Sequence, residues 1–178
     1  MNQNIKEIKI PKNVNVSLKD NNILLTGLHG NSQININPNI NIKINSNFIY
    51  LSPINNKKEN KKFIGLYNSL IKKNLKGLSQ NYKINLFLNG IGFKVKQVEN
   101  KLIFKLGYSH DIEVDIPENI NVSILRSTQL IFYGANWAEL TQYVHNIKKL
   151  RKVEPYKGKG ILLKNETVLR KEGKKNKK

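Results

Sequence analysis

The sequence IPKNVNVS at Ile10–Ser17 returns as IPENINVS at Ile116–Ser123. Six of the eight positions are identical, and the two exchanges are Lys to Glu and Val to Ile. A near-copy separated by more than half the chain is typical of a duplicated domain. Since the chain has 178 residues, we predict two small domains, each long enough for a modest apolar core.

Both copies alternate apolar and polar residues, which is the period of a half-buried strand. Each continues through a polar break into a second apolar run, at Ile23–Gly27 and at Gln129–Gly134. Pro11 and Pro117 stand at the strand entries, where a missing N–H costs least. Each copy therefore predicts a β-hairpin, and duplication predicts that the two hairpins are equivalent. The positions expected on the buried faces are Val14, Val16 and Leu18, and Ile120, Val122 and Ile124.

Further strands and one helix are predicted between the copies. Gln33–Asn45 alternates isoleucine with polar residues around a turn at Asn37–Asn39, and Phe48–Pro53 is another short strand. Asn-rich alternation also occurs in aggregation-prone segments, but the regular apolar face favours ordinary strands. A helix follows, with Gly77 as its C-cap. Its apolar positions are Phe63, Leu66, Tyr67, Leu70, Ile71 and Leu78.

The second half is predicted to contain strands at Lys83–Phe87, Phe93–Val98 and Leu102–Leu106, then the second hairpin and a helix. The helix runs from about Asn136 and is ended by Pro155. Its apolar stripe is Trp137, Leu140, Val144, Ile147 and Leu150. The predicted fold class is α+β: two tandem, internally duplicated domains, each an antiparallel sheet packed against one helix. The predicted ranges are 1–81 and 82–153 for the domains and 154–178 for a basic C-terminal extension.

The charge is strongly unbalanced. Lys and Arg number 31 against 12 Asp and Glu, a formal net charge of +19 at pH 7. A globular protein with this excess usually binds a polyanion. The chain has no Cys, which excludes disulfides, thiolate metal sites and cysteine nucleophiles. No apolar run reaches the roughly 18 residues of a membrane-spanning helix.

Candidate catalytic groups are sparse. The acidic alternation at Asp111–Asp115 is interpreted as an exposed strand edge, and neither Asn89–Gly92 nor Tyr156–Gly160 fits a nucleotide-binding loop. The histidines lack metal-ligand spacing; they are His29, His110 and His145. We therefore predict a protein that is not an enzyme and that uses no metal or cofactor.

The C-terminal stretch carries much of the excess charge, with 13 basic and 3 acidic residues from Lys148 to Lys178. In YKGKG at Tyr156–Gly160, which we expect in a loop outside the folded core, glycines would let the backbone approach phosphates that the lysines neutralise. Tyr156 is predicted either to stack on a base or to anchor in the core. Arg170–Lys178 is predicted to be an arm that orders on RNA. The predicted RNA-binding residues are Lys148, Lys149, Arg151, Lys152, Tyr156, Lys157, Gly158, Lys159, Gly160, Arg170, Lys171, Lys174 and Lys175.

These C-terminal residues carry a family resemblance. RKVEPYKGKGI at Arg151–Ile161 and RKEGKK at Arg170–Lys175 resemble the C-terminal signature of large-subunit ribosomal protein L-six, in its bacterial and organellar form. The resemblance covers nearly the whole chain. Further matching stretches, in the family's order, are Ile8–Val16, Gly77–Val95 and Lys101–Pro117. One departure is Val153, where the family usually has proline.

The resemblance implies two related α+β domains in a structural constituent of the large ribosomal subunit. It implies binding to large-subunit rRNA, mainly by the second domain and the tail, near the sarcin–ricin loop and the stalk base. Neighbouring ribosomal proteins and translational GTPases would lie close by. The competing hypothesis is a free-standing basic RNA- or DNA-binding organellar protein, which explains the charge but not the ordered motifs.

Composition also bears on location. Asn, Lys and Ile, which A/T-rich codons specify, make up 79 of the 178 residues. The N-terminus shows neither a secretory nor a transit-peptide pattern. We therefore expect a ribosome of the mitochondrial matrix, with the gene in the organelle. A plastid-type organelle and the cytoplasm of an A/T-rich bacterium are the alternatives.

Overall fold

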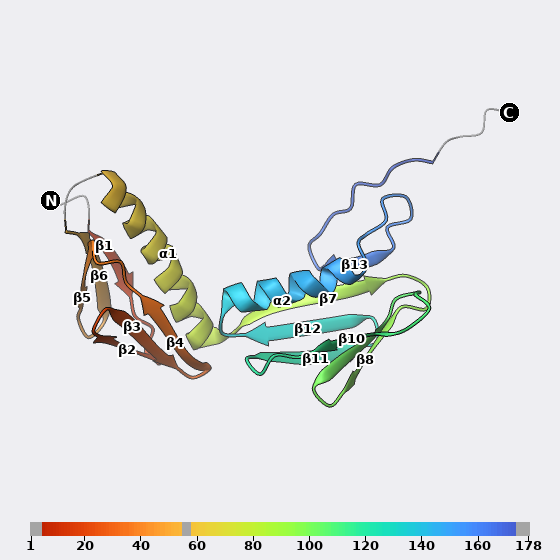
Figure 1. The fold of residues 1–178 in the computed structure, drawn as a ribbon, viewed down its shortest axis with the longest axis horizontal. Coiled ribbons are helices and arrows are strands. Elements are labelled where there is room, and N and C mark those ends of the chain that lie inside the picture. Colours follow the sequence, from red (N-terminus) through yellow and green to blue (C-terminus); the bar gives the residue numbers. More distant parts are fainter. Residues whose placement is uncertain (1–4, 55–57, 174–178) are drawn as a thin grey trace. The chain divides into compact units, whose positions relative to one another are not determined.

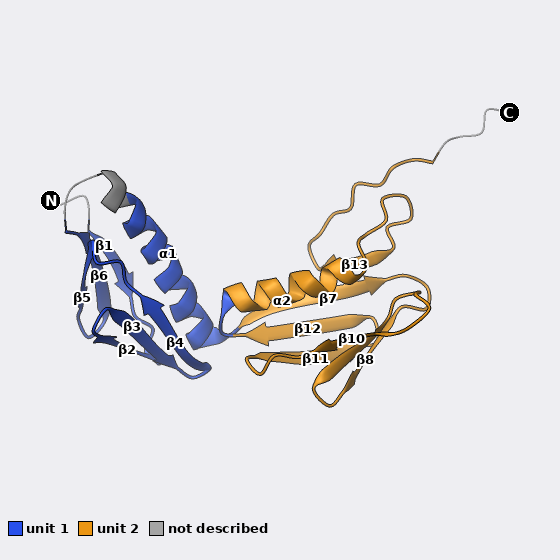
Figure 2. Cartoon of the chain, viewed as in Figure 1, with its two compact units in different colours: residues 1–81, 135–137 blue, residues 82–134, 138–178 orange. Residues whose placement is uncertain are grey.

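The computed structural model describes residues 5–54 and 58–173 (Figure 1). The chain divides into two compact units (Figure 2). Unit 1 comprises Met1–Asn81 and Ala135–Trp137, and unit 2 comprises Tyr82–Gly134 and Ala138–Lys178. Each unit buries its own cluster of apolar side chains.

Unit 1 consists of two antiparallel sheets and a helix. Its elements are β1 (Lys6–Lys9), β2 (Val14–Lys19), β3 (Asn22–Gly27), β4 (Gly30–Asn35), β5 (Ile40–Ile44), β6 (Phe48–Pro53) and α1 (Lys58–Gln80). One sheet has the order β1-β6-β5 and the other β2-β3-β4. Both sheets supply buried isoleucines and leucines to one core, to which α1 adds Ile64, Ile71, Leu75 and Leu78.

Unit 2 has the same kinds of layer. Its elements are β7 (Tyr82–Asn89), β8 (Lys94–Val98), β9 (Lys101–Lys105), β10 (Ile112–Asp115), β11 (Ile120–Arg126), β12 (Gln129–Gly134), α2 (Trp137–Leu150) and β13 (Gly160–Leu163). The sheets have the orders β10-β9-β8 and β11-β12-β7-β13. Helix α2 buries Leu140, Val144 and Ile147 in their common core.

The two units follow one plan, which confirms the predicted duplication. β1 to β6 and α1 correspond in chain order to β7 to β12 and α2. The sheets correspond in the same way, β1-β6-β5 to β7-β12-β11 and β2-β3-β4 to β8-β9-β10. Strand β13, which pairs with the outer edge of β7, has no counterpart among the described strands of unit 1.

Matching hydrogen bonds support this correspondence. In unit 1 the side-chain amide of Asn21 donates to the carbonyl of Ile36 (3.1 Å), and the N–H of Ile36 donates to the carbonyl of Asn21 (2.8 Å). In unit 2 Asn100 and Ile116 make the same two bonds, at 3.0 and 2.9 Å. Each asparagine lies in the turn between the second and third strands of its unit, and it holds there the crossover that follows the fourth strand.

A tyrosine on each helix holds the same crossover. The hydroxyl of Tyr67 on α1 donates to the carbonyl of Asn35 (3.1 Å), and that of Tyr143 on α2 donates to the carbonyl of Asp115 (2.9 Å). Burial, with a smaller effect of the Asp115 charge, raises the pKa of Tyr143 to about 12. Tyr143 therefore remains a neutral hydrogen-bond donor at any physiological pH.

The sequence repeat does not mark equivalent elements. Its first copy leads from β1 into β2, whereas its second leads from β10 into β11, the counterpart of the step from β4 to β5. The prediction that the two hairpins are equivalent is therefore wrong. Their local structures do agree: Val14 pairs with Gly27 and Ile120 with Gly134, and both Val14 and Ile120 are buried. The copies resemble each other because both cross between sheets and then begin a strand.

The strand predictions for both halves are confirmed, including buried isoleucines in the Asn-rich segment. The turn at Asn37–Asn39 joins β4 to β5, which pair with different neighbours, so it links two sheets. The predicted C-cap at Gly77 is wrong, because α1 continues to Gln80 and the residue with positive φ is Asn81. Leu66 and Leu70 are exposed, whereas Ile64 and Leu75, which the predicted face omitted, are buried.

Exchanging Asn100 for alanine tests the structural equivalence. The substitution removes the donor to the Ile116 carbonyl, which should cost about 1–2 kcal/mol in the free energy of unfolding of unit 2. Asn21→Ala should cost a similar amount in unit 1. Asn121→Ala, at an exposed position inside the sequence repeat, should stay within about 0.5 kcal/mol. Urea denaturation measures all three; equal effects of Asn121→Ala and Asn100→Ala would contradict this assignment.

Candidate nucleic-acid interface

The basic C-terminal segment is partly built into the sheet of unit 2. Helix α2 ends at Leu150, before Pro155, so this proline does not end it. After a loop the chain forms β13, which pairs antiparallel with β7 from Gly160↔Asn89 to Leu163↔Leu86. Ile161 is completely buried. The expectation of a loop outside the folded core is therefore wrong for the end of the YKGKG stretch.

The loop between α2 and β13 is a closed turn. The N–H of Glu154 donates to the carbonyl of Lys159 (2.8 Å), and the N–H of Gly158 donates to the carbonyl of Glu154 (2.9 Å). The side-chain amide of Asn89 at the end of β7 donates to the carbonyl of Gly158 (2.9 Å). Tyr156 is 55% exposed, so of its two predicted roles the anchor in the core is wrong.

The two glycines of this stretch are required by the protein itself. Gly160 has φ +148°, and a Cβ at this position would lie 2.6 Å from the Cα of Val153. Gly158 has φ +66°, and a Cβ there would lie 3.4 Å from the guanidinium of Arg170. Both glycines are buried. Close approach to RNA is therefore not needed to explain either glycine, and their place among the RNA-binding residues stays a prediction.

The following tail returns to this turn. The N–H of Lys171 donates to the carbonyl of Pro155 (3.0 Å), while the Arg170 side chain lies over Gly158. Both residues are exposed. Two further predicted contacts, Lys174 and Lys175, lie outside the described residues.

Two of the predicted cations are engaged inside the unit. The guanidinium of Arg151 lies over the ring of Tyr108, 4.7 Å from its centre, and the hydroxyl of Tyr108 donates to the carbonyl of Leu150 (3.0 Å). The Nζ of Lys148 donates to Glu166 at 2.6 Å, with the two side chains 23% and 29% exposed. These contacts tie the end of α2 to the segments around it.

Glu166 joins α2 to the end of β13. One carboxylate oxygen accepts from Lys148, and the other accepts from the N–H of Leu163 (3.2 Å). The hydrogen bond from Lys148 is the main reason that the pKa of Glu166 lies below its ordinary value, with a smaller contribution from the Leu163 bond; burial opposes both. Sequence reasoning missed Glu166 because its partners are defined only by the fold.

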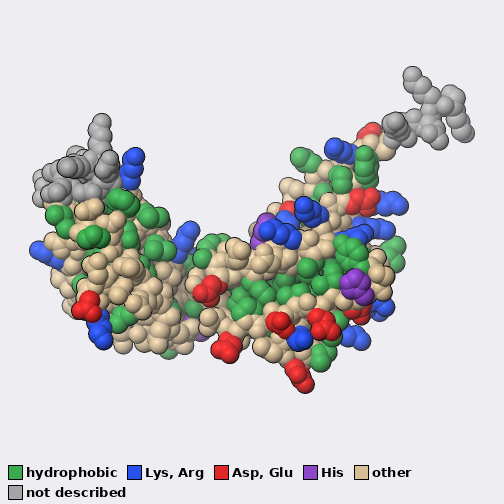
Figure 3. All heavy atoms as spheres, viewed as in Figure 1, with side chains coloured by type: hydrophobic (Ala, Val, Ile, Leu, Met, Phe, Trp, Pro, Cys, Tyr) green, Lys and Arg blue, Asp and Glu red, His purple; other side chains and the backbone are tan. Residues whose placement is uncertain are grey.

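The remaining predicted cations form the candidate surface. Their shared feature is exposure on the segment from the end of α2 to the tail; they are Lys149, Lys152, Lys157, Arg170 and Lys171, with Lys159 half-buried. Figure 3 shows Lys and Arg side chains gathered over this part of unit 2. The carboxylates of β10 lie elsewhere, where Lys101 pairs with Glu113 (3.3 Å) and Asp115 (3.9 Å).

The described residues offer little for other chemistry. Within residues 5–54 and 58–173, no group of three or more His, Cys, Asp or Glu side chains could hold a metal ion. No helix in this part of the chain has the length and apolarity to cross a membrane. The structure is that of a duplicated two-unit α+β protein with a basic surface on its second unit.

The chain belongs to the ribosomal protein L6 family. The model of the family described as Ribosomal protein L6 matches residues 10–81 and 89–163. The first match begins just after β1, and the second begins at the end of β7, the counterpart of β1. The matches therefore follow the correspondence of the strands and not the repeated sequence at Ile10 and Ile116. Family membership identifies a structural ribosomal protein rather than an enzyme.

Its relatives are bacterial and organellar. The chain is 37% identical to the large ribosomal subunit protein uL6 of Spiroplasma citri, over 95% of this chain and 94% of the relative. It is also 37% identical to uL6 of Borreliella afzelii, over 94% and 93%. The large ribosomal subunit protein uL6m of Reclinomonas americana is 39% identical over 96% of each chain.

Gly160→Ala should destabilise the free protein. The added methyl group meets the Val153 backbone at a φ that disfavours alanine, so we expect a loss of about 2–4 kcal/mol from unit 2. Gly173→Ala is the matched control, because a Cβ at Gly173 meets nothing within 4 Å. Thermal and urea denaturation of the RNA-free protein measures the stability of both variants. An unchanged melting temperature of Gly160→Ala would show that the fold does not require glycine here, and would leave close approach to RNA as the reason for it.

Acidification should weaken unit 2 through Glu166. Its folded-state pKa is lowered, so its contribution to stability is present above the ordinary value of 4.5 and is lost as pH falls through the folded-state pKa. Glu166→Gln removes this contribution and should flatten the acid limb of the stability curve. Urea denaturation from neutral pH downward measures the difference between the two proteins. A constant difference across that range would show that the Glu166 charge is not coupled to folding.

Proposed function

We propose that the chain is a structural constituent of the large ribosomal subunit and binds large-subunit rRNA near the sarcin–ricin loop and the stalk base. The observation that carries this proposal is the row of exposed cations on unit 2, in a chain of the ribosomal protein L6 family. The relatives are themselves large ribosomal subunit proteins. Neighbouring ribosomal proteins are its other partners, and translational GTPases act nearby.

The division of the cations gives the proposal its mechanism. Lys149, Lys152 and Lys157 are exposed, so they can lower the repulsion between phosphates. Lys148 and Arg151 instead hold α2 in place through Glu166 and Tyr108. The half-exposed ring of Tyr156 beside Lys157 offers a face for a base or sugar. The protein thereby acts as a brace: a rigid sheet holds a pattern of positive charge against RNA.

The ribosome that we propose is organellar, in the mitochondrial matrix. Two observations support this location: the abundance of Asn, Lys and Ile, which A/T-rich codons specify, and the similarity to uL6m of Reclinomonas americana. Similarity to the proteins of Spiroplasma citri and Borreliella afzelii supports the alternative of a bacterial cytoplasm, and a plastid-type organelle is the third possibility. The genome that encodes the chain, read with the neighbouring genes, decides among them.

Removing exposed lysines should lower the salt dependence of rRNA binding. For each of Lys149→Ala, Lys152→Ala and Lys157→Ala, we expect the slope of log affinity against log salt to fall by about 0.7–0.9, because one phosphate contact is lost. Lys101→Ala is the control, since Lys101 lies on β9 and pairs with carboxylates. Filter binding to large-subunit rRNA across a salt series measures the slopes.

Incorporation into large ribosomal subunits distinguishes a ribosomal protein from a free-standing RNA-binding protein. The wild-type protein should co-sediment stoichiometrically with large subunits in moderate salt, and the triple lysine variant should be depleted from them. Slopes equal to that of Lys101→Ala would contradict the proposed surface. Failure of the wild-type protein to sediment with large subunits would contradict the ribosomal role itself.

A further inference from the structure

Strand β1 has an open edge where its counterpart in unit 2 is occupied. β7 pairs with β12 on one edge and with β13 on the other. β1, the counterpart of β7, pairs with β6, and no other strand among the described residues lies against it. The described part of unit 1 therefore has no counterpart of the strand that completes this sheet in unit 2.

On the open edge of β1, the outward-facing N–H and C=O groups belong to the residues that correspond to those of β7 that bond to β13. The N–H of Ile10 donates to the carbonyl of Asn47 (2.9 Å), and the β1–β6 register has no interruption. Because alternate residues of a strand bond to opposite sides, Glu7 and Lys9 turn their N–H and C=O groups away from β6. In unit 2 the counterpart of Glu7 is Asn85, whose carbonyl accepts from Lys164 at the end of β13 (3.2 Å).

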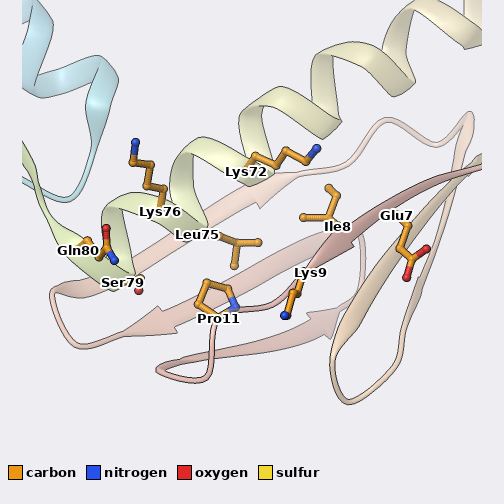
Figure 4. A pocket seen from close by; sticks show the side chains of 9 residues that line it. All are labelled: Glu7, Ile8, Lys9, Pro11, Lys72, Leu75, Lys76, Ser79 and Gln80. Carbon is orange, nitrogen blue, oxygen red and sulfur yellow. The ribbon is translucent and has the colours of Figure 1, made fainter.

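A groove of about 610 Å³ runs along this edge, between β1 and the C-terminal half of α1. Figure 4 shows the side chains that line it, with Lys72, Leu75 and Lys76 on the helix and residues 7–9 and Pro11 on the strand side. In unit 2 the strand at the corresponding edge buries Ile161 in one apolar cluster with Ile147 of α2. The groove thus lies between β1 and α1, the counterparts of β7 and α2, which β13 contacts in unit 2.

We propose that this groove binds an extended, acidic segment of another protein, which adds to β1 as an antiparallel strand in the way that β13 adds to β7. The edge of β1 offers alternating N–H donors and C=O acceptors, which a second polypeptide strand satisfies together. Lys9 and Lys72 line the groove together with one carboxylate, that of Glu7, so acidic side chains on the added strand are favoured.

RNA fits the groove less well than a polypeptide does. A phosphate ribbon would bring its oxygens to the edge carbonyls and to the carboxylate of Glu7, and RNA has no regular series of donors for these carbonyls. The proposed strand-binding site lies wholly in unit 1, whereas the proposed rRNA surface lies in unit 2. Each proposal can therefore fail without the other.

Binding of a model peptide to the full chain tests the proposal. The probe is a fluorescent peptide of about eight residues that alternates Glu with Val and Thr. The same peptide with Lys for Glu, and a single-stranded RNA of similar length, are the comparison probes. Fluorescence anisotropy at low salt should show binding of the acidic peptide. Hydrogen exchange of the wild-type protein with the peptide bound should show new protection at the amides of Glu7 and Lys9.

Variants of Lys9 separate strand addition from simple charge attraction. Lys9→Pro removes the N–H that faces the groove but none that bonds to β6, and should weaken peptide binding about tenfold or more. Lys9→Ala keeps that N–H and should have a smaller effect that disappears at high salt. Lys43→Ala, on β5 and outside the groove, is the control and should bind normally.

The outcomes are distinct. Protection confined to the β1 amides, together with a larger loss for Lys9→Pro than for Lys9→Ala, supports the added strand. Binding of the peptide without protection of Glu7 and Lys9 overturns it, and this readout does not depend on any variant folding. Competition by the RNA that displaces the peptide from the groove also overturns it, in favour of a nucleic-acid site.

Discussion

Pairing of β7 with strands on both of its edges is the constraint on which unit 2 depends. On one edge β12 carries the hairpin that leads into α2, and on the other β13 carries the basic segment. The side chain of Asn89, at the end of β7, also holds the turn before β13. The position of the basic loop is therefore fixed by main-chain hydrogen bonds of the sheet, which places its cations on a rigid support.

The same segment shows why net charge alone does not define a binding surface. Lys148 is engaged by Glu166 and Arg151 by Tyr108, so their charges stabilise the end of α2. Such partly buried contacts are screened by salt less than exposed charges are. The exposed lysines keep their hydration and their freedom to approach phosphates. A cation's neighbours, more than its place in a basic run, therefore indicate which role it has.

Sequence patterns predicted what is local and missed what is distant. Alternation predicted the strands, because side chains on a strand face opposite sides whatever the strand pairs with. The repeat predicted two similar hairpins correctly but their equivalence wrongly, since Val14 and Ile120 report the same local environment at different steps of the fold. β13 escaped prediction because four residues within a basic stretch give no clear period, and its partner β7 lies far away in the chain. The bonds of Tyr108 and Glu166 depend on the same long-range packing.

Duplication explains how one plan gives two different surfaces. In both units, one edge of the first strand is left unpaired by the six strands that the units share. In unit 2 this edge pairs with β13, a later strand of the same chain. β1 is short, and its sequence KEIK places charged residues on the open edge, which is how proteins keep identical edges from pairing. Since Lys9 and Lys72 outnumber the one glutamate of the groove beside it, two copies of unit 1 would repel each other there. The same charges attract an acidic strand, so protection against self-association and selection of a partner follow from one arrangement.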